Sequence, residues 1–265
     1  MPAKKKTIKK EESSEEERQV LEPVDVESTK IEMTPVENWK PKTDTGRKVQ
    51  AGEISDIDQI LDNGISILEP QIVDSLIGLE SELLMIGQAK GKFGGGQRRV
   101  FRQTQKKTRE GNKPKFTTLA VVGNKDGYVG LGVGKSKETV PAREKALKNA
   151  KLNVFKIARG SGSWESNSSD PTSIPFAVTG KCGSVEITLM PAPKGKGLCV
   201  EKECAKILAL AGIKDVWSKT KGQTKNKINL IFACEDALRK LISTKIRPHD
   251  MQTVAYQEGK IKLVQ

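Results

Sequence analysis

The stretch FTTLAVVGNKDGYVGLGV, residues 116–133, predicts the fold of the central part of this 265-residue chain. Residues 116–122 are mostly β-branched and apolar, and residues 128–133 alternate large side chains with glycine, so both runs favour extended strands. Between them lies GNKDG, a cluster of turn-forming residues that indicates a hairpin. We therefore expect two antiparallel strands joined by a tight turn.

The segments on either side of this hairpin predict a third strand and a helix. Residues 103–109 are a polar strand candidate, joined to Phe116 by a loop over residues 110–115, which gives a three-stranded antiparallel meander. A helix is expected over residues 139–157, with Thr139 as N-cap and Pro141 in its first turn. Its apolar side holds Ala146, Leu147, Ala150, Val154 and Ile157, and its lysine side holds Lys145, Lys148, Lys151 and Lys156.

Residues 132–136, GVGKS, look like the end of a phosphate-binding P-loop, but the spacing is wrong. The full pattern needs a glycine at position 129, where Val129 stands. The glycines also alternate along a predicted strand, where bare positions on one face let a helix or another backbone approach closely. We therefore expect close packing here and no nucleotide site.

Positive charge is concentrated on the same part of the chain. Residues 89–159 hold 19 Lys and Arg but only 4 Asp and Glu, a net charge of +15, whereas the whole chain carries +13. Residues 1–88 carry −8 and residues 160–265 carry +6. Because cations placed at phosphates release condensed counterions, this patch predicts a shaped polyanion such as RNA as the partner. Aromatic residues make up only 4% of the chain, which disfavours base stacking and favours backbone recognition of structured RNA.

The remaining composition excludes several classes of function. The only histidine is His249, and the four cysteines are spaced too widely for a redox pair or a zinc site, so we expect reduced cysteines, no metal, no cofactor and no catalytic residues. No stretch approaches about 18 consecutive apolar residues, and no signal peptide pattern opens the chain. We expect no membrane partner and a cytoplasmic location.

The chain divides into six segments by composition. Residues 1–38 are a charged, low-complexity tail that is expected to be disordered. Residues 39–88 are a helical extension, with helical spacing over residues 54–67 and 70–84 and with Trp39 as a packing anchor. The others are the basic module at residues 89–159, a linker at 160–173, a second α+β module at 174–243 and a C-terminal extension at 244–265.

Within the second module the pattern predicts strands at residues 174–179, 184–190 and 214–218 and helices at residues 200–211 and 227–241. The loop PAPKGKG, residues 191–197, comes just before the first of these helices. It can hold an anion at that helix N-terminus, present a rigid turn to a partner protein, or be an ordinary turn. Residue chemistry alone leaves these three interpretations open.

Several motifs together resemble one family. The segments are QKKTREGNKPKF (105–116), VVGNKDGYVGLGVGKSKE (121–138), AKLN (150–153), GSW (162–164), IPF (174–176), TGKCGS (179–184), PAP (191–193) and AGIKDVW (211–217). Their order resembles small-subunit ribosomal protein S five of the archaeal and eukaryotic type, over most of residues 40–243. WKPKT (39–43) and IVDSL (72–76) resemble the lead-in of the archaeal branch.

The resemblance implies an α+β fold in which a double-stranded-RNA-binding-like N-module, a three-stranded antiparallel sheet plus a helix, precedes an α+β C-module. It implies a structural constituent of the small ribosomal subunit that binds rRNA near the neck and near the channel by which mRNA enters, and that supports subunit assembly and translational accuracy. The implied partners are small-subunit rRNA, mRNA and ribosomal proteins S four and S eight. The loop at residues 109–115 resembles the family's RNA-contacting loop, and residues 191–197 resemble the part that faces protein S four.

The chain departs from the family pattern in three places. The glycine-rich stretch at residues 90–99 is an insertion, residues 198–203 replace the usual small apolar start of a helix, and the tail is rich in Lys and Glu. The tail favours an archaeal source.

Charge and resemblance together give the candidate site residues. The predicted RNA-binding residues are Arg98, Arg99, Arg102, Lys106, Lys107, Arg109, Lys113, Lys115, Lys135, Lys137, Arg143, Lys145 and Lys148. The predicted protein interface is Pro191, Pro193, Lys194, Gly195, Lys196 and Gly197. The alternative function is a free double-stranded-RNA-binding regulator, which the second module and the ordered motifs argue against. A P-loop enzyme is disfavoured by Val129.

Overall fold

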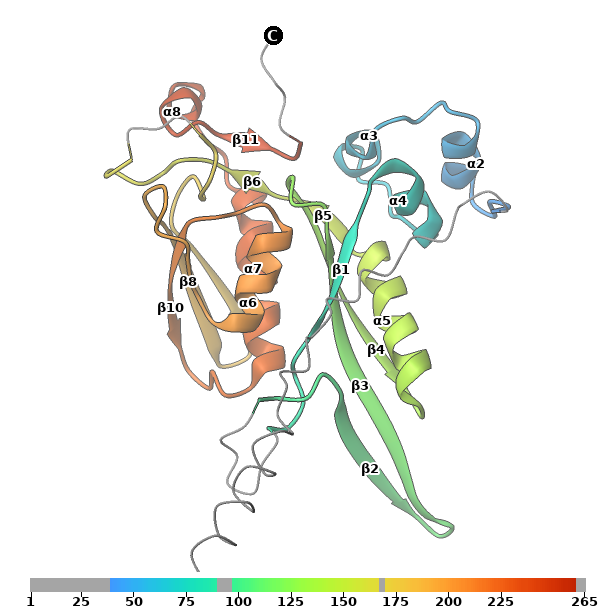
Figure 1. Ribbon diagram of the computed structural model, residues 1–265. Helices are drawn as coiled ribbons and strands as arrows, with labels where there is room; N and C mark the ends of the chain where they lie inside the picture. Colours follow the sequence, from blue (N-terminus) through green and yellow to red (C-terminus); the bar gives the residue numbers. More distant parts are fainter. Residues whose placement is uncertain (1–38, 90–96, 167–169, 261–265) are drawn as a thin grey trace, which may run out of the picture.

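The computed structural model describes residues 39–89, 97–166 and 170–260, so the predictions for residues 1–38 and 90–96 lie outside the described residues. Two α+β modules lie side by side (Figure 1). In the first sheet β1 (Glu80–Leu84), β3 (Gly111–Gly123), β4 (Tyr128–Ser136) and β5 (Val154–Lys156) are neighbours in that order, and β2 (Arg102–Thr108) also pairs with β3. The predicted α+β class is confirmed, and β1 and β5 enlarge the predicted three-stranded sheet.

One side chain organises the turn between β3 and β4. Asn124 Oδ1 accepts hydrogen bonds from the backbone N–H groups of Asp126, at 2.8 Å, and Tyr128, at 3.2 Å. Gly127 has a φ of 90°, a backbone conformation that glycine adopts without steric cost. The hairpin therefore forms where the sequence predicts it.

Helix α5 (Thr139–Leu152) lies directly on the bare glycine face of β4. A Cβ atom added to Gly130, Gly132 or Gly134 would lie 2.3, 2.1 or 2.0 Å from the helix backbone. The helix meets these glycines with buried alanines at i, i+4 spacing, namely Ala142, Ala146 and Ala150. The predicted packing role of the glycine run is thus correct, and GVGKS lies in a strand and not in a phosphate-binding loop.

The helix is shorter than its sequence pattern predicts. Glu138 is the N-cap residue in place of Thr139, and the helix ends at Leu152, not at residue 157. Residues 154–156 form β5, which is antiparallel to β4 and buries Val154 and Phe155. Apolar residues over so short a run fit helical and extended periodicity equally well, which explains the error.

The N-terminal extension forms three short helices, α2 (Asp44–Gln50), α3 (Ile57–Asp62) and α4 (Pro70–Leu76), beside α5 (Figure 1). The predicted helix over residues 70–84 is wrong after Leu76, because residues 80–84 form β1 against β3. The segment proposed as a helical extension therefore also supplies a strand to the first sheet.

Trp39 anchors this extension, as predicted. Its Nε1 donates to Glu69 Oε2 at 2.8 Å. The other oxygen, Oε1, accepts from the backbone N–H groups of Lys42 at 2.8 Å and Thr43 at 2.7 Å. The Glu69 carboxylate thus holds residues 39–43 against the N-terminus of α4.

The second sheet contains β7 (Val178–Cys182), β8 (Val185–Pro191), β10 (Val216–Lys221) and β9 (Leu198–Cys199), in that order. Helices α6 (Lys202–Leu210) and α7 (Lys227–Ser243) lie between this sheet and the first (Figure 1). The first strand begins four residues later than position 174, and β9 was not predicted. Beyond α7, α8 (Pro248–Thr253) leads to β11 (Gln257–Glu258), which pairs with β6 (Ala158–Arg159).

A hydrophobic core joins the two modules through β3. Leu119 and Val121 belong to the cluster formed with α6 and α7, whereas Ala120 and Val122 belong to the cluster formed with α5. All four side chains are fully buried. Because successive side chains of a strand point to opposite faces, this half of β3 lies between helices of both modules.

Polar contacts also connect the modules. Glu203 of α6, only 5% exposed, accepts a hydrogen bond from the backbone N–H of Met85 at 2.8 Å. The backbone N–H of Lys125 donates to the carbonyl of Leu210 at 2.8 Å. These bonds and the shared core fix the position of the first sheet relative to the second module.

Candidate nucleic-acid interface

Most of the predicted RNA-binding residues lie on a hairpin formed by β2 and the first half of β3. The ladder runs from Arg102 opposite Thr117 to Thr108 opposite Gly111. The hairpin projects from the body beyond α5 (Figure 1), and most of its side chains are exposed. Among the described residues no helix covers it, whereas α5, α6 and α7 cover residues 118–123 of β3.

The predicted loop over residues 109–115 is wrong, because the turn contains only Arg109 and Glu110. Residues 111–115 belong to β3, although Gly111, Asn112 and Pro114 are residues typical of turns. Of the described strands, only β2 pairs with this part of β3, since β4 reaches only to the position opposite Phe116. Proline is tolerated on such an open edge.

One face of the hairpin is cationic. Residues opposite each other in an antiparallel pair share a face, and side chains alternate along each strand. The hairpin cationic face therefore carries Arg102, Thr104, Lys106, Lys113 and Lys115. One side of β3 holds Lys113 and Lys115 together with Leu119 and Val121, which pack against the second module. The hairpin cationic face therefore lies on the same side of the sheet as the second module.

Two lysines of this face oppose each other. Lys106 and Lys113 are direct partners across the ladder, and like charges in such a pair destabilise it. Lys113 pairs with the exposed Glu110 at 2.8 Å, but Lys106 has no ion pair with any residue of the described ranges. The hairpin therefore holds an excess of positive charge that an anionic partner would neutralise.

Lys135 extends the cationic face onto a third strand. Lys135 of β4 is opposite Thr117, which is itself opposite Arg102, so the three residues form one row across the sheet. Lys137 follows in the exposed segment between β4 and α5. Both lysines, which the sequence analysis listed among the RNA-binding residues, lie at the base of the hairpin.

The helix lysines do not share this surface. Lys145 and Lys148 are exposed and Arg143 is half-buried on α5, which covers the other face of the sheet. Lys107 lies opposite Asn112 on that other face as well. The sequence analysis grouped these residues with the hairpin cations as one RNA-binding set, but the sheet separates the two groups.

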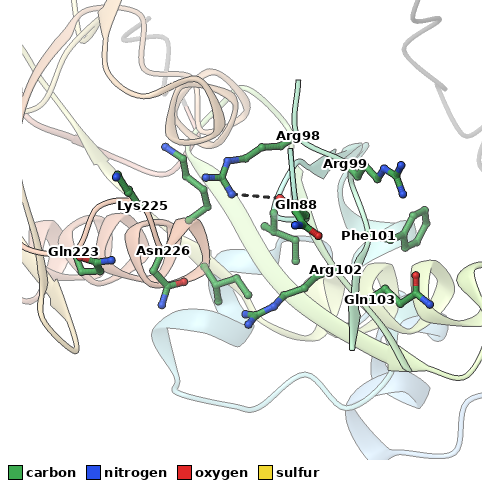
Figure 2. Close-up of a pocket in the computed structure, with 13 residues that line it drawn as sticks. Gln88, Arg98, Arg99, Phe101, Arg102, Gln103, Gln223, Lys225 and Asn226 are labelled. Carbon is green, nitrogen blue, oxygen red and sulfur yellow. Dashed lines mark hydrogen bonds between the residues drawn. The ribbon is translucent and has the colours of Figure 1, made fainter. Parts of the chain in front are cut away.

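Arg98, Arg99 and Arg102 lie at a cleft between the modules. A cavity of about 500 Å³ separates residues 86–88 and 98–103 from residues 223–228 at the start of α7. Figure 2 shows Arg98 and Arg102 extending toward Lys225 and Asn226, whereas Arg99 extends the opposite way. Sequence analysis missed Lys225, since more than a hundred residues separate it from the arginines and only the fold brings them together.

The loop at residues 191–197 is exposed at residues 194–196, and it does not form the N-terminus of a helix. Strand β9 intervenes before α6, and the Glu201 carboxylate already accepts from the N–H groups of Glu203 and Cys204 at that helix N-terminus. The interpretation as an anion site at the helix is therefore wrong. Gly195 and Gly197 have φ values of 88° and 74°. A hydrogen bond from Lys194 to Asp170 raises the pKa of Lys194 and lowers that of Asp170.

Comparison with known proteins identifies the family. Residues 98–158 match the family model described as Ribosomal protein S5, N-terminal domain, and residues 180–249 match the one described as Ribosomal protein S5, C-terminal domain. The small ribosomal subunit protein uS5 of Nanoarchaeum equitans is 48% identical over 230 residues, which cover 86% of this chain and 99% of that protein. The chain belongs to the uS5 family.

Further relatives agree. The uS5 protein of Methanocaldococcus jannaschii is 41% identical over 227 residues, covering 85% of this chain and 98% of that protein. The uS5 protein of Pyrobaculum calidifontis is 46% identical over 202 residues, covering 76% of this chain and 93% of that protein. These relatives support the archaeal branch. Membership of the uS5 family makes the chain a structural ribosomal protein and not an enzyme.

The described ranges contain neither a metal-binding cluster nor a membrane-spanning helix. Within residues 39–89, 97–166 and 170–260, no group of three or more His, Cys, Asp or Glu side chains is placed to hold a metal ion. Among the helices of those same ranges, none has the length and apolar character needed to cross a membrane.

Proposed function

We propose that this chain binds small-subunit rRNA through the hairpin cationic face, as a structural constituent of the small ribosomal subunit. The observation that carries the proposal is the direct opposition of Lys106 and Lys113 on a hairpin that no helix of the described ranges covers. The arrangement is unfavourable in the isolated protein and becomes favourable when phosphates lie between the two cations.

The face suits the RNA backbone and not base edges. Arg102, Lys106 and the row partner Lys135 present cations at fixed spacings on a sheet surface. A-form RNA exposes phosphates and 2′-hydroxyl groups across a wide minor groove, so spaced cations can recognise its shape without reading its sequence. The rigid junction between β3 and the second module holds this surface in one orientation.

The family resemblance supports a more specific place. We infer a position near the neck of the small subunit and near the channel by which mRNA enters, in cytoplasmic ribosomes, with support for subunit assembly and translational accuracy. Ribosomal proteins S four and S eight are the proposed protein neighbours. The exposed loop at residues 191–197, with Lys194 and Lys196 at its tip, is the surface proposed to face protein S four.

The salt dependence of binding tests the RNA surface. Log affinity for small-subunit rRNA fragments is measured against log salt for Lys106→Ala, Lys113→Ala and Lys115→Ala. Each lost phosphate contact should reduce the slope by roughly 1 and weaken binding similarly across RNA sequences. Lys219→Ala, an exposed lysine of β10 outside the hairpin, is the control. Slopes equal to that of the control would place the RNA surface elsewhere.

Two further measurements test the ribosomal assignment. Co-sedimentation with small subunits separates a ribosomal constituent from a free double-stranded-RNA-binding regulator, which would remain in the unbound fraction. Gly195→Asp adds negative charge to the loop at residues 191–197 and should alter decoding accuracy more than rRNA affinity. Gly195→Asn is the matched variant, since asparagine tolerates the positive φ and adds no charge. An equal fall in binding to bare rRNA would show that the loop contacts RNA.

A further inference from the structure

The cleft between the modules differs in chemistry from the hairpin cationic face. Its lining includes apolar side chains, carboxamides and cations together, among them Ile86, Ile228, Gln88, Asn226, Arg98 and Lys225. Ile86 is 5% exposed and belongs to the hydrophobic core that the two modules share. Phosphates alone require cations and hydrogen-bond donors but gain nothing from apolar surface. The cleft therefore suits a ligand that has an anionic part and a flat part with polar edges.

Not all cations of the cleft have an acidic partner among the described residues. None of the described residues that line the cavity is Asp or Glu. Lys227 is paired with Glu201 at 2.9 Å, and Arg98 Nη1 donates to the carbonyl of Gly87 at 3.3 Å. Arg102 and Lys225 form no ion pair with the residues that the structure describes. Two cations from different modules thus remain for a ligand (Figure 2).

Asn226 is also uncommitted at the helix start. It occupies the N-cap position of the 17-residue helix α7, yet its side chain makes no capping hydrogen bond. Figure 2 shows it on the wall that Arg98 and Arg102 approach. A carboxamide offers donors and an acceptor together, which matches the edge of a nucleobase.

We propose that this cleft takes one unpaired RNA nucleotide, turned out of a helix that lies along the hairpin cationic face. Arginine guanidinium planes stack on bases, and unstacked bases are the usual targets of sequence-specific RNA recognition. A volume of about 500 Å³ falls in the range of about 300–1,000 Å³ that small-molecule sites occupy. Arg102 belongs both to the cleft and to the hairpin cationic face, so a helix on that face passes the mouth of the cleft. The inference rests on the proposed function, because the hairpin must bring the RNA to the cleft.

The experiment compares two RNA hairpins with stems of about 16 base pairs, identical except for one unpaired nucleotide in the stem. Binding of the full-length protein is measured by fluorescence anisotropy with each of the four bases at that position. For at least one base, the wild-type protein should bind the bulged RNA roughly tenfold more tightly, the effect of one stacked base. Lys225→Glu and Asn226→Ala should remove most of this preference and change affinity for the paired RNA by less than about twofold. Lys219→Glu makes the same charge change on β10 and should leave the preference intact.

A photoreactive uridine at the unpaired position provides a second readout. Its crosslink should map to residues 86–88, 98–103 or 223–228. The inference is overturned if no base gives a preference, if Lys225→Glu weakens both RNAs equally, or if the crosslink maps elsewhere. The slope of log affinity against log salt for Lys106→Ala distinguishes failure of the cleft proposal from failure of the hairpin proposal. A reduced slope with no bulge preference would reject the cleft alone, whereas an unchanged slope would reject the hairpin surface.

Discussion

The two halves of β3 are continuous in the chain but differ in what holds them in place. Residues 118–123 are buried between α5 on one face and α6 with α7 on the other. Residues 111–117 pair with β2 and are mostly exposed, and Lys113 among them lies opposite Lys106 of β2. Residues 118–123, the upper half, are held by apolar burial on both faces. Residues 111–117, the lower half, are held mainly by backbone hydrogen bonds to the neighbouring strand.

This difference separates the part of the strand that stabilises the protein from the part that binds. Apolar burial stabilises by roughly 25 cal/mol per Å² removed from water, whereas exposed polar side chains of a two-stranded ribbon contribute little. A protein selected for stability alone would not place two lysines opposite each other on that ribbon. The predictions below test this separation, in order of decreasing effect.

Gly132→Ala should have the largest effect on stability, because it forces α5 away from β4. The new Cβ would lie 2.1 Å from the backbone nitrogen of Ala150. We expect a loss of more than about 4 kcal/mol in the free energy of unfolding, or failure to fold, measured by urea denaturation. Gly78→Ala is the control, since its Cβ meets nothing within 4 Å and its φ is not positive. A stable Gly132→Ala variant would show that the helix is not as closely packed as described.

Truncating side chains in each half of β3 tests the contrast directly. Leu119→Ala removes a fully buried side chain from the shared core and should cost about 2–5 kcal/mol of unfolding free energy. Lys115→Ala, four residues earlier, should change that free energy by less than about 0.5 kcal/mol while weakening RNA binding. Similar stability losses in the two variants would contradict the division of β3.

Lys106→Glu should move stability and binding in opposite directions. It places a carboxylate opposite Lys113, which should stabilise the hairpin by about 0.2–1 kcal/mol, seen as slower amide hydrogen exchange in β2. Its affinity for RNA should fall, since a cation is replaced by an anion. Lys107→Glu is the matched variant, because it faces Asn112 and gains no opposite charge. Faster exchange in Lys106→Glu than in Lys107→Glu would be inconsistent with this account.

The last prediction concerns a part of the chain held by polar contacts. Burial raises the pKa of the Glu69 carboxyl, but hydrogen bonds from the Lys42 and Thr43 backbone and from Trp39 outweigh it, so its pKa lies below the ordinary value of 4.5. A depressed carboxyl pKa contributes stability at higher pH that is lost as pH falls through the folded-state pKa.

Glu69→Gln should therefore cost about 1 kcal/mol or less at neutral pH, with the difference from wild type shrinking as the pH falls below about 4. Thermal unfolding of both proteins as a function of pH measures this. A difference that persists at low pH would mean that the carboxylate charge is not what matters.

Much of the fold follows from local pattern, and the exceptions have physical causes. The hairpin at residues 116–133 and the close approach at the glycine run were predictable because turn chemistry and missing side chains act locally. The strand at residues 111–115 was not, since Gly111 and Pro114 are typical of loops and only the open edge of β3 accommodates them.

The candidate site shows the same limit. The lysines of the hairpin were found from charge density, but their division between two faces required the ladder register. The opposition of Lys106 and Lys113 is invisible until the turn is known to contain only two residues. The cleft depends on how two modules pack, so no periodicity near Lys225 could indicate that it faces Arg98 and Arg102.

The pairing of β11 with β6 has a consequence for the order of events during synthesis. Arg159 is 3% exposed, and its Nη2 donates to Asp126 at 2.8 Å and to the carbonyl of Gly259 at 2.8 Å. A chain growing from its N-terminus makes Arg159 about a hundred residues before Gly259. At the usual rate of about 5–20 residues per second, the first module waits at least several seconds for this acceptor. Burial of the Arg159 guanidinium is therefore one of the last steps of folding during synthesis. It is completed only after both modules have been synthesised.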